Sequence, residues 1–224
     1  MLGVTTRRIT VLAVLAALCV TAVAATQATA APASSRATLT GIRDRVDSWL
    51  DANGFTTFKV DEVMAFTNND YAAVADKTGK PAFELLVAAD GRWLMEEPAS
   101  MMWNTKYGML PHASGTVQPS SGLGMMWGTG MTGSGRGGPR SWSSRGSGPV
   151  SSLAQAVTAA NRWLAKAHPA ESAESDGRGY PGYYTLDTVR NGKTFGMLSI
   201  NRVSGAVWYH GWHGRFLAEQ RFSG

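Results

Sequence analysis

The residues best suited to chemistry lie in one methionine-rich stretch, which begins MMWNTKYGMLPH at residue 101. Its methionines gather around a single histidine. Thioether sulfur is a soft ligand that suits Cu(I) and needs no deprotonation, so this set is a candidate copper site. The candidate ligands are Met101, Met102, Met109, His112, Met125 and Met126. Met101 and Met102 are adjacent, so both can reach one ion only if the chain bends there.

The same stretch has two other interpretations. Methionine is an adaptable apolar filler, so Met101 and Met102 can pack against a sheet, and Met101 and Trp103 share one face if the segment is extended. Large apolar residues can also bind a partner, which glycine-flanked Met125-Met126-Trp127 favours. The candidate partner-binding residues are Trp103, Tyr107, Trp127 and Trp212. Packing is favoured for residues 101–107, and the other two interpretations stay open.

The remaining residues do not form a catalytic pattern. His210 and His213 can share a metal only if the chain turns at Gly211, so we expect packed or exposed histidines instead. Neither H-E-x-x-H nor G-x-S-x-G occurs in the sequence. The glycine pattern GTGMTG lacks the strand before it and the helix after it that dinucleotide binding requires. The sequence therefore predicts a protein that is not an enzyme.

Two adjacent carboxylate pairs, Asp61-Glu62 and Glu96-Glu97, also fail to suggest acid–base chemistry. Adjacent side chains on a strand point to opposite faces, so the two carboxylates of a pair should diverge. We expect both pairs on solvated faces.

The N-terminus has the pattern of a secretory signal peptide. Arg7 and Arg8 precede a short apolar run, and small residues end at Ala28-Thr29-Ala30. We expect residues 1–30 to be the signal, with cleavage near Ala30, and residues 31–37 to be a tail of the secreted or extracytoplasmic chain. The single cysteine, Cys19, lies within the signal. No later apolar run is long enough to span a membrane, so no span is expected once the signal is removed.

Charge and composition separate the remaining chain into segments. The net charge of +5 is small and mostly dispersed, so a nucleic-acid partner is not expected. Residues 111–149 are rich in glycine and serine and predict a flexible linker. On either side lie residues 38–110 and residues 150–224, in which several landmarks recur at a nearly constant offset, as in an internal repeat. The matching landmarks are Trp49 with Trp163, Tyr71 with Tyr184, Gly79 with Gly192, and Gly91 with Gly205.

Each unit begins with an amphipathic helix and continues with strands. Leu39, Ile42, Val46, Trp49 and Leu50 share one helical face in the first unit, as do Leu153, Val157, Ala160 and Leu164 in the second. Gly54 suits a left-handed cap after the first helix, while Ser152 and Gln155 have the spacing of a capping box before the second. Short turns between β-rich runs predict antiparallel neighbours. The predicted fold is α+β, a helix packed on a small antiparallel sheet, twice, joined by the linker.

The strand sequences LLVAADGRWLM and LSINRVSGAVWYH, each after a helix and with a turn at glycine, resemble the PepSY family. The resemblance covers about residues 38–98 and 151–216. It implies an extracytoplasmic binding or regulatory module, often beside or within secreted peptidases. The segment MMWNTKYGM lies outside that pattern and is similar to a segment of small secreted bacterial proteins of unknown role.

Together these observations predict a secreted, non-enzymatic module that binds a protein or peptide partner, such as a secreted peptidase. Addition of a peptide strand to a sheet edge is the physical route to such binding. The alternative is an extracytoplasmic protein that binds Cu(I) through its methionine and histidine cluster.

Overall fold

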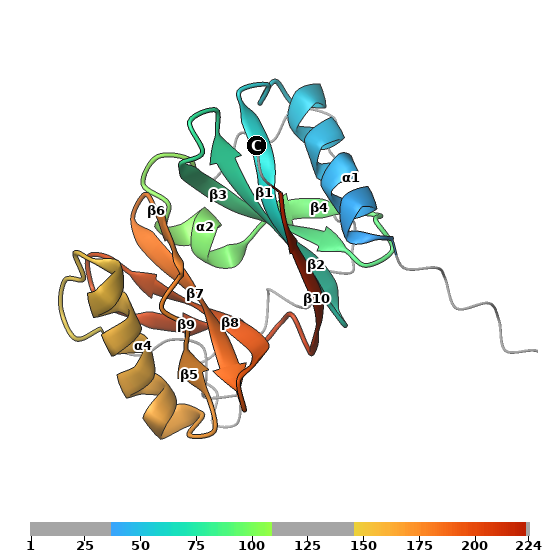
Figure 1. The fold of residues 1–224 in the computed structure, drawn as a ribbon. Coiled ribbons are helices and arrows are strands. Elements are labelled where there is room, and N and C mark those ends of the chain that lie inside the picture. Colours follow the sequence, from blue (N-terminus) through green and yellow to red (C-terminus); the bar gives the residue numbers. More distant parts are fainter. Residues whose placement is uncertain (1–36, 109–145, 223–224) are drawn as a thin grey trace, which may run out of the picture. The chain divides into compact units, whose positions relative to one another are not determined.

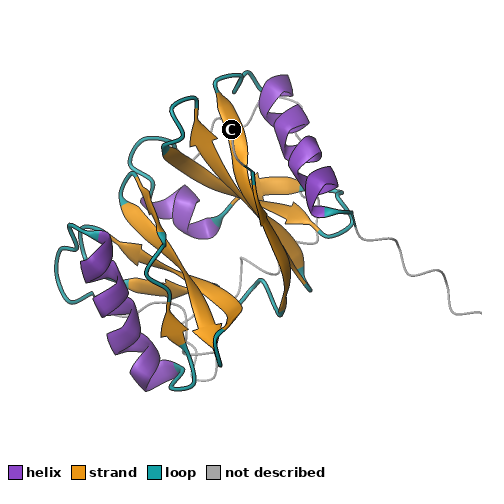
Figure 2. Cartoon of the chain, viewed as in Figure 1, coloured by secondary structure: helices purple, strands orange, loops and turns teal. Residues whose placement is uncertain are grey.

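The computed structural model describes residues 37–108 and 146–222 and shows a mixed α+β fold with antiparallel sheets (Figures 1 and 2). These residues belong to one unit, Ser34–Gly224. The predicted signal peptide and most of the predicted linker lie outside the described residues. Within the described ranges, no helix combines the length and the apolar composition needed to cross a bilayer.

Helix α1 (Leu39–Ala52) forms where the apolar spacing predicted a helix. The Thr38 side chain caps its N-terminus by accepting a hydrogen bond of 3.0 Å from the Gly41 N–H. After its C-terminus, Gly54 takes the left-handed backbone conformation expected for it, with φ of 80°. The buried face of the helix consists of Ile42, Val46 and Leu50.

The sheet beneath α1 has the strand order β10-β1-β2-β3-β4, in which β10 is Phe216–Arg221. Strands β1 (Phe58–Phe66), β2 (Asn69–Asp76), β3 (Pro81–Ala88) and β4 (Leu94–Glu96) follow one another along the chain and pair antiparallel. The run FKVDEVMAF, predicted as an extra strand of the first unit, is β1. Apolar residues of α1, β1, β2 and β3 pack together into one core.

Helix α4 (Leu153–Ala167) begins at the predicted capping box. The Ser152 hydroxyl accepts from the Gln155 N–H at 3.3 Å, and the Gln155 side chain accepts from the Ser151 N–H at 2.8 Å. Its sheet contains β7 (Tyr183–Arg190), β8 (Lys193–Asn201) and β9 (Val207–Tyr209). The polar, glycine-rich stretch before β7 supplies only the short strands β5 (Ser172–Ala173) and β6 (Arg178–Tyr180), which both pair with β7.

The last strand, β10 (Phe216–Arg221), does not join the sheet that precedes it in sequence. It pairs antiparallel with β1 and forms one edge of the first sheet (Figure 1). The sequence did not predict this crossing. The C-terminal segment therefore links the region that follows the glycine-rich stretch to the region that precedes it.

The methionine segment begins in a short helix, α2 (Pro98–Trp103), and not in extended chain. Pro98 stands in the first turn, where its missing N–H breaks no helical hydrogen bond. The Glu97 carboxylate caps this helix by accepting from the Ala99 and Ser100 N–H groups at 2.7 Å and 3.1 Å. The shared face that an extended segment would give Met101 and Trp103 is therefore absent.

Each sheet has two buried faces of different character. We call the face packed on α1 or α4 the helix-covered face and the opposite one the inner face. The helix-covered faces are apolar, with Val63, Phe83, Leu186 and Leu198 among their buried residues. The inner faces contact each other, and they carry most of the polar side chains described below.

Candidate functional site

A buried carboxylate on β3 is the centre of a polar cluster between the inner faces. Glu84 is 0% exposed. Its Oε1 accepts a hydrogen bond from the Tyr71 hydroxyl, and its Oε2 accepts one of 3.1 Å from the Thr185 hydroxyl of β7. The Tyr180 hydroxyl of β6 lies 3.3 Å from that of Tyr71. One carboxylate therefore connects strands that lie on either side of the glycine-rich stretch.

The cluster continues through hydroxyl groups to a histidine. The Ser199 hydroxyl of β8 lies 3.0 Å from that of Thr185 and 2.9 Å from His210 Nε2. Glu97 Oε1 lies 3.5 Å from the same nitrogen. A second histidine, His213, has its Nδ1 2.7 Å from Asn69 Oδ1 on β2. We call Glu84, Glu97, Tyr71, Tyr180, Thr185, Ser199 and His210 the inner polar cluster.

Burial shifts the protonation of this cluster toward neutral forms. Desolvation raises the pKa of Glu84, and the hydrogen bond from Tyr71 lowers it. Desolvation is the larger effect, so the pKa rises to about 7. Desolvation also raises the pKa of Glu97 well above its usual value. The same cause lowers the pKa of His210 far below its usual value and that of His213 to about 3. Because His210 is neutral at pH 7, its contact with Glu97 is not an ion pair.

The Ser199–His210 contact has the spacing of a nucleophile and its base, but these groups are enclosed. Ser199 is 0% exposed and His210 is 3% exposed, so a substrate cannot contact them in this conformation. Buried polar groups cost free energy unless they are hydrogen-bonded, and here the bonds Glu84–Thr185 and Tyr71–Tyr180 join the two inner faces. The arrangement suits a structural role, in which it fixes how the two inner faces meet.

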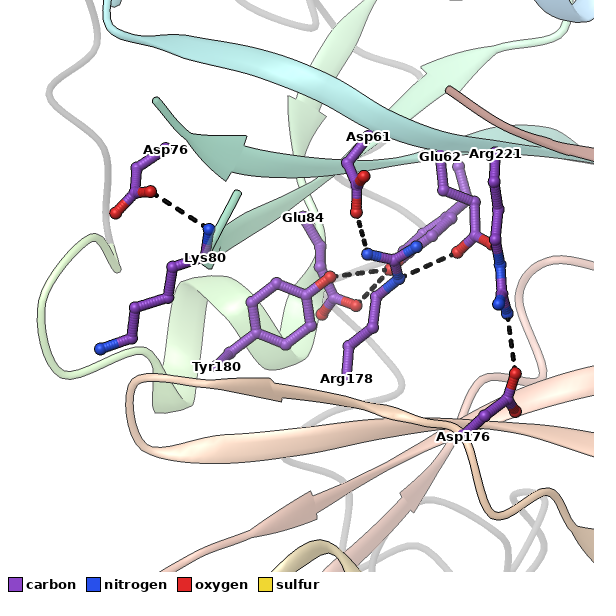
Figure 3. A network of polar contacts seen from close by, with 10 residues as sticks. Asp61, Glu62, Asp76, Lys80, Glu84, Asp176, Arg178, Tyr180 and Arg221 are labelled. Atoms are coloured by element: carbon purple, nitrogen blue, oxygen red, sulfur yellow. Dashed lines mark hydrogen bonds and ion pairs between the residues drawn. The ribbon is translucent and has the colours of Figure 1, made fainter. Parts of the chain in front are cut away.

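A second polar network lies at the rim of the inner faces (Figure 3). Arg178 of β6 contacts both Asp61 and Glu62 of β1, and its Nε lies 3.1 Å from Glu62 Oε2. Arg221 of β10 contacts Glu62 Oε1 at 2.7 Å and Asp176 at 3.1 Å. The Glu62 side chain is 3% exposed, so this carboxylate is buried between two guanidinium groups.

The expectation that Asp61 and Glu62 diverge on a solvated face is wrong. The register between β1 and β2 shifts between Val60 and Glu62, which makes Asp61 the extra residue of a β-bulge. A bulge interrupts the alternation of side chains, so two adjacent carboxylates can turn to the same arginine. The strand pattern alone did not contain that shift.

The same expectation is wrong for Glu96 and Glu97. The chain leaves β4 at Glu96 and enters α2 after Glu97, so the alternation of a strand ends between them. Glu96 Oε1 accepts from the Ser100 hydroxyl at 2.9 Å, while Glu97 accepts from the Ser100 N–H. Glu97 is 0% exposed. Both carboxylates therefore converge on one residue of the helix.

The histidines that the structure describes pack against other side chains. Packed or exposed histidines were expected. His210 and His213 are buried on either side of a turn that includes Gly211, and their ring centroids are 5.4 Å apart. His168 stacks on Tyr209 at 4.2 Å. Among residues 37–108 and 146–222, no group of three or more His, Cys, Asp or Glu side chains is arranged to hold a metal ion.

The copper candidates are described only in part. Met102 is 61% exposed and Met101 is half-buried on α2. Neighbouring residues of a helix point in different directions, so these two sulfur atoms do not face one site within α2. The other candidate ligands, Met109, His112, Met125 and Met126, lie outside the described residues. Copper binding stays a prediction.

The candidate partner-binding aromatic residues are half-buried where they are described. The ring centroids of Trp103 and Trp208 are 5.4 Å apart, and those of Tyr107 and Phe58 are 5.5 Å apart. Trp212 stacks on His210 at 4.6 Å. Each therefore packs on the protein while part of its surface stays accessible. Trp127 lies outside the described residues.

Strand β10 provides an edge at the surface. Leu217 is 43% exposed, and Glu219, Gln220 and Arg221 are also exposed. In the described sheet, β10 pairs with β1 on one side only. An edge strand presents unpaired N–H and C=O groups to which another extended chain can bond. This edge is the part of the described surface best suited to strand addition.

The residues that the sequence analysis missed are mainly those of the inner polar cluster. Glu84 stands in AFELLVA, a run of apolar residues long enough to be a strand buried on both faces. A single carboxylate in such a run predicts a buried acid with specific partners. That signal was present, whereas nothing near Thr185 or Ser199 distinguishes those hydroxyl groups from exposed ones.

Comparisons with protein-family models, with curated proteins and with solved structures found no match for this chain.

Proposed function

We propose that this protein is an extracytoplasmic, non-enzymatic module that binds an extended segment of a protein or peptide partner. The observation that carries the proposal is the position of β10, an exposed edge strand of a five-stranded antiparallel sheet. Backbone hydrogen bonds would supply affinity, and alternate side chains would supply specificity. The enclosed Ser199 and His210 support a structural use of the groups that are otherwise capable of chemistry.

The proposal includes a secreted peptidase as a suitable partner class, which follows from the PepSY resemblance. A peptidase binds substrates in extended form, so a module that presents a free strand edge near it can bind its flexible segments. The export signal expected in residues 1–30 would place the two proteins in one compartment.

We further propose that the two helix-and-sheet units are diverged repeats. Corresponding hairpins turn at Gly79 and Gly192, with φ of 78° and 70°, and corresponding later turns use Gly91 and Gly205, with φ of 72° and 68°. Residues other than glycine rarely adopt a positive φ, so glycines shared at these positions support common descent. The match of Tyr71 with Tyr184 does not support it. Tyr71 packs on the inner face and Tyr184 packs on the helix-covered face.

Affinity capture tests the binding function. The chain from residue 31 on, immobilised and exposed to culture supernatant, should retain a defined protein or peptide. Leu217→Pro is the informative variant because Leu217 has no register partner on β1, so its proline removes a backbone donor with little effect on that pairing. Leu217→Ala is the matched control. We expect retention by Leu217→Ala and reduced retention by Leu217→Pro, and failure to retain anything across several salt and pH conditions would contradict the proposal.

The alternative function is extracytoplasmic binding of Cu(I). The observation in its favour is Met102, whose large thioether side chain is 61% exposed where the methionine-rich segment begins. Titration with Cu(I) against a competing chelator tests it. Binding weaker than about micromolar, or about 8 kcal/mol of binding free energy, would contradict copper handling as a function.

A further inference from the structure

Strand β10 contributes few buried side chains to the sheet that it completes. Phe216 and Ala218 are half-buried, and the rest of the strand is exposed. Its neighbour β1 is different, because Val63, Met64 and Phe66 are each 0% exposed. The strand that covers the β1 edge is therefore held mainly by backbone pairing and by few buried side chains, while the edge itself is part of the core.

The contacts that hold β10 are specific and separate. Phe216 packs edge-on against Phe66, with ring centroids 5.8 Å apart. Arg221 reaches the buried carboxylate of Glu62 at 2.7 Å. Just beyond the strand, Phe222 donates its N–H to the Asp61 carbonyl at 2.8 Å. An aromatic side chain, a guanidinium and a second aromatic residue therefore mark three positions along this edge.

The chain before β10 is fixed independently of the strand. The Trp212 carbonyl accepts from the side-chain amides of Asn68 and Asn69, each at 3.2 Å. The Arg215 carbonyl accepts from the Thr67 N–H at 2.9 Å. Residues up to Arg215 can therefore stay in place while residues 216–222 leave, which places the hinge between Arg215 and Phe216.

We propose that β10 is a replaceable strand that occupies the partner's binding site. When residues 216–222 detach, a partner's extended segment pairs with the bared edge of β1. This inference rests on the proposed binding function but places the partner on β1 instead of on the outer edge of β10, so here Leu217→Pro should not reduce retention. Sheets open most readily where few apolar contacts hold a strand, and β10 is such a strand.

The site defines the chemistry of the segment that it takes. The segment runs antiparallel to β1, with an aromatic or large apolar residue at the position of Phe216 and a small residue at that of Ala218. A guanidinium at the position of Arg221 pairs with Glu62 Oε1, the oxygen that Arg178 leaves free, and this carboxylate is 3% exposed. An arginine is preferred to a lysine there because its planar group can bond to a carboxylate along two directions.

The resident strand makes binding conditional. A tethered strand competes at an effective concentration that is in the millimolar range for a short connection. The apparent affinity for a free segment is reduced by the fraction of molecules in which β10 is detached. A free peptide should therefore bind weakly to the intact chain, and locking β10 in place should abolish its binding.

A disulfide lock tests this proposal. Ala65 and Ala218 are register partners on β1 and β10, and the chain from residue 31 on has no cysteine to interfere. The probe is a fluorescent peptide with the sequence RFLAEQRF, copied from residues 215–222, and fluorescence anisotropy measures its binding. We expect the Ala65→Cys/Ala218→Cys chain to lose peptide binding when oxidised and to regain it when reduced. Val63→Cys/Gln220→Cys, at another register pair, repeats the test if the first variant does not fold.

The peptide supplies a matched specificity control. Replacement of its second arginine by alanine should weaken binding about threefold to fivefold, because it removes the more exposed of the two cations beside Glu62 while Arg178 stays. Equal binding by the oxidised and reduced chains, equal binding of this altered peptide, or no peptide binding to the reduced chain would each overturn the proposal. If the oxidised chain still retains a natural partner from culture supernatant, the binding function stands and only strand replacement fails. If neither chain retains one, the proposed function itself fails.

Discussion

The helix-covered face and the inner face of each sheet are both buried, but their side chains differ in kind. On the helix-covered face of the first sheet, Val63, Leu85 and Val87 pack with the apolar face of α1. On its inner face, Tyr71 and Glu84 bond to residues of the second sheet. Apolar contact is not directional, whereas hydrogen bonds require specific partners at specific distances. We expect the helix-covered faces to supply most of the stability and the inner faces to select one way for the sheets to meet.

The largest loss of stability should come from the helix-covered faces. Leu50 on α1 is 1% exposed and Leu164 on α4 is 0% exposed. Leu50→Ala and Leu164→Ala should each lower the free energy of unfolding by about 2–5 kcal/mol, because each removes buried apolar surface and leaves a cavity. Urea denaturation followed by tryptophan fluorescence measures the change. Leu217→Ala, at an exposed leucine, is the control and should cost well under 1 kcal/mol. A loss below about 1 kcal/mol at both helices would show that these faces do not dominate stability.

The next largest effect should come from the buried carboxylate of the inner faces. Glu84→Ala leaves the hydroxyls of Tyr71 and Thr185 without their acceptor and should cost about 2–4 kcal/mol, since each unsatisfied buried group costs about 1–3 kcal/mol. Glu84→Gln keeps the shape and one acceptor oxygen, so it should cost clearly less.

The two Glu84 variants also differ in their dependence on pH. The folded protein raises the pKa of Glu84 from 4.5 to about 7. Its protonated form is therefore favoured by folding, and this stabilisation is complete below the unfolded pKa and is lost as the pH rises through 7. The wild-type midpoint of urea denaturation should accordingly fall between pH 5 and 8 relative to that of Glu84→Gln. Parallel curves for the two proteins would show that Glu84 ionises normally.

The two kinds of face also explain what the sequence could predict. The apolar periodicity that includes Ile42, Val46 and Leu50 reports burial against a sheet, so α1 followed directly from it. The capping residues Ser152 and Gln155 interact within a few positions of the chain, so the start of α4 could also be predicted from the sequence. The inner faces depend on contacts between residues far apart in sequence, such as Glu84 with Thr185. A polar residue buried by such a contact looks in sequence like a solvated one.

Local irregularities set the second limit on prediction. The bulge at Asp61 and the change from strand to helix at Glu97 each reverse the direction expected for a carboxylate. The crossing of β10 to β1 has a similar origin, because turn lengths favour neighbouring strands and do not reveal an exchange between sheets. Of the candidate site, the β10 edge and the inner polar cluster were not predicted, and a partner role for the aromatic residues stays a prediction.

A smaller effect should separate the two arginines that share Glu62. The Arg178 side chain is 18% exposed and that of Arg221 is 54% exposed. Arg178→Ala should cost about 1–3 kcal/mol, because it removes the more buried partner of a carboxylate that stays buried. Arg221→Ala should cost about 1 kcal/mol or less, since solvent screens the more exposed pair. Thermal denaturation measures both losses. Equal losses would mean that the two arginines stabilise Glu62 alike, whatever the burial of their side chains.

The smallest effect should come from the methionines of α2, which belong to neither face. Met102 is 61% exposed, and leucine conserves most of the volume of methionine. The double variant Met101→Leu/Met102→Leu should therefore change the free energy of unfolding by less than about 0.5 kcal/mol. If these sulfur atoms bind Cu(I), the same variant should lose copper affinity with an unchanged Tm of the metal-free protein. If they only pack or contact a partner, Cu(I) should not raise the Tm of the wild type. A Tm that falls by several degrees without metal would contradict the exposed position of Met102 and would place this segment among the packed parts of the protein.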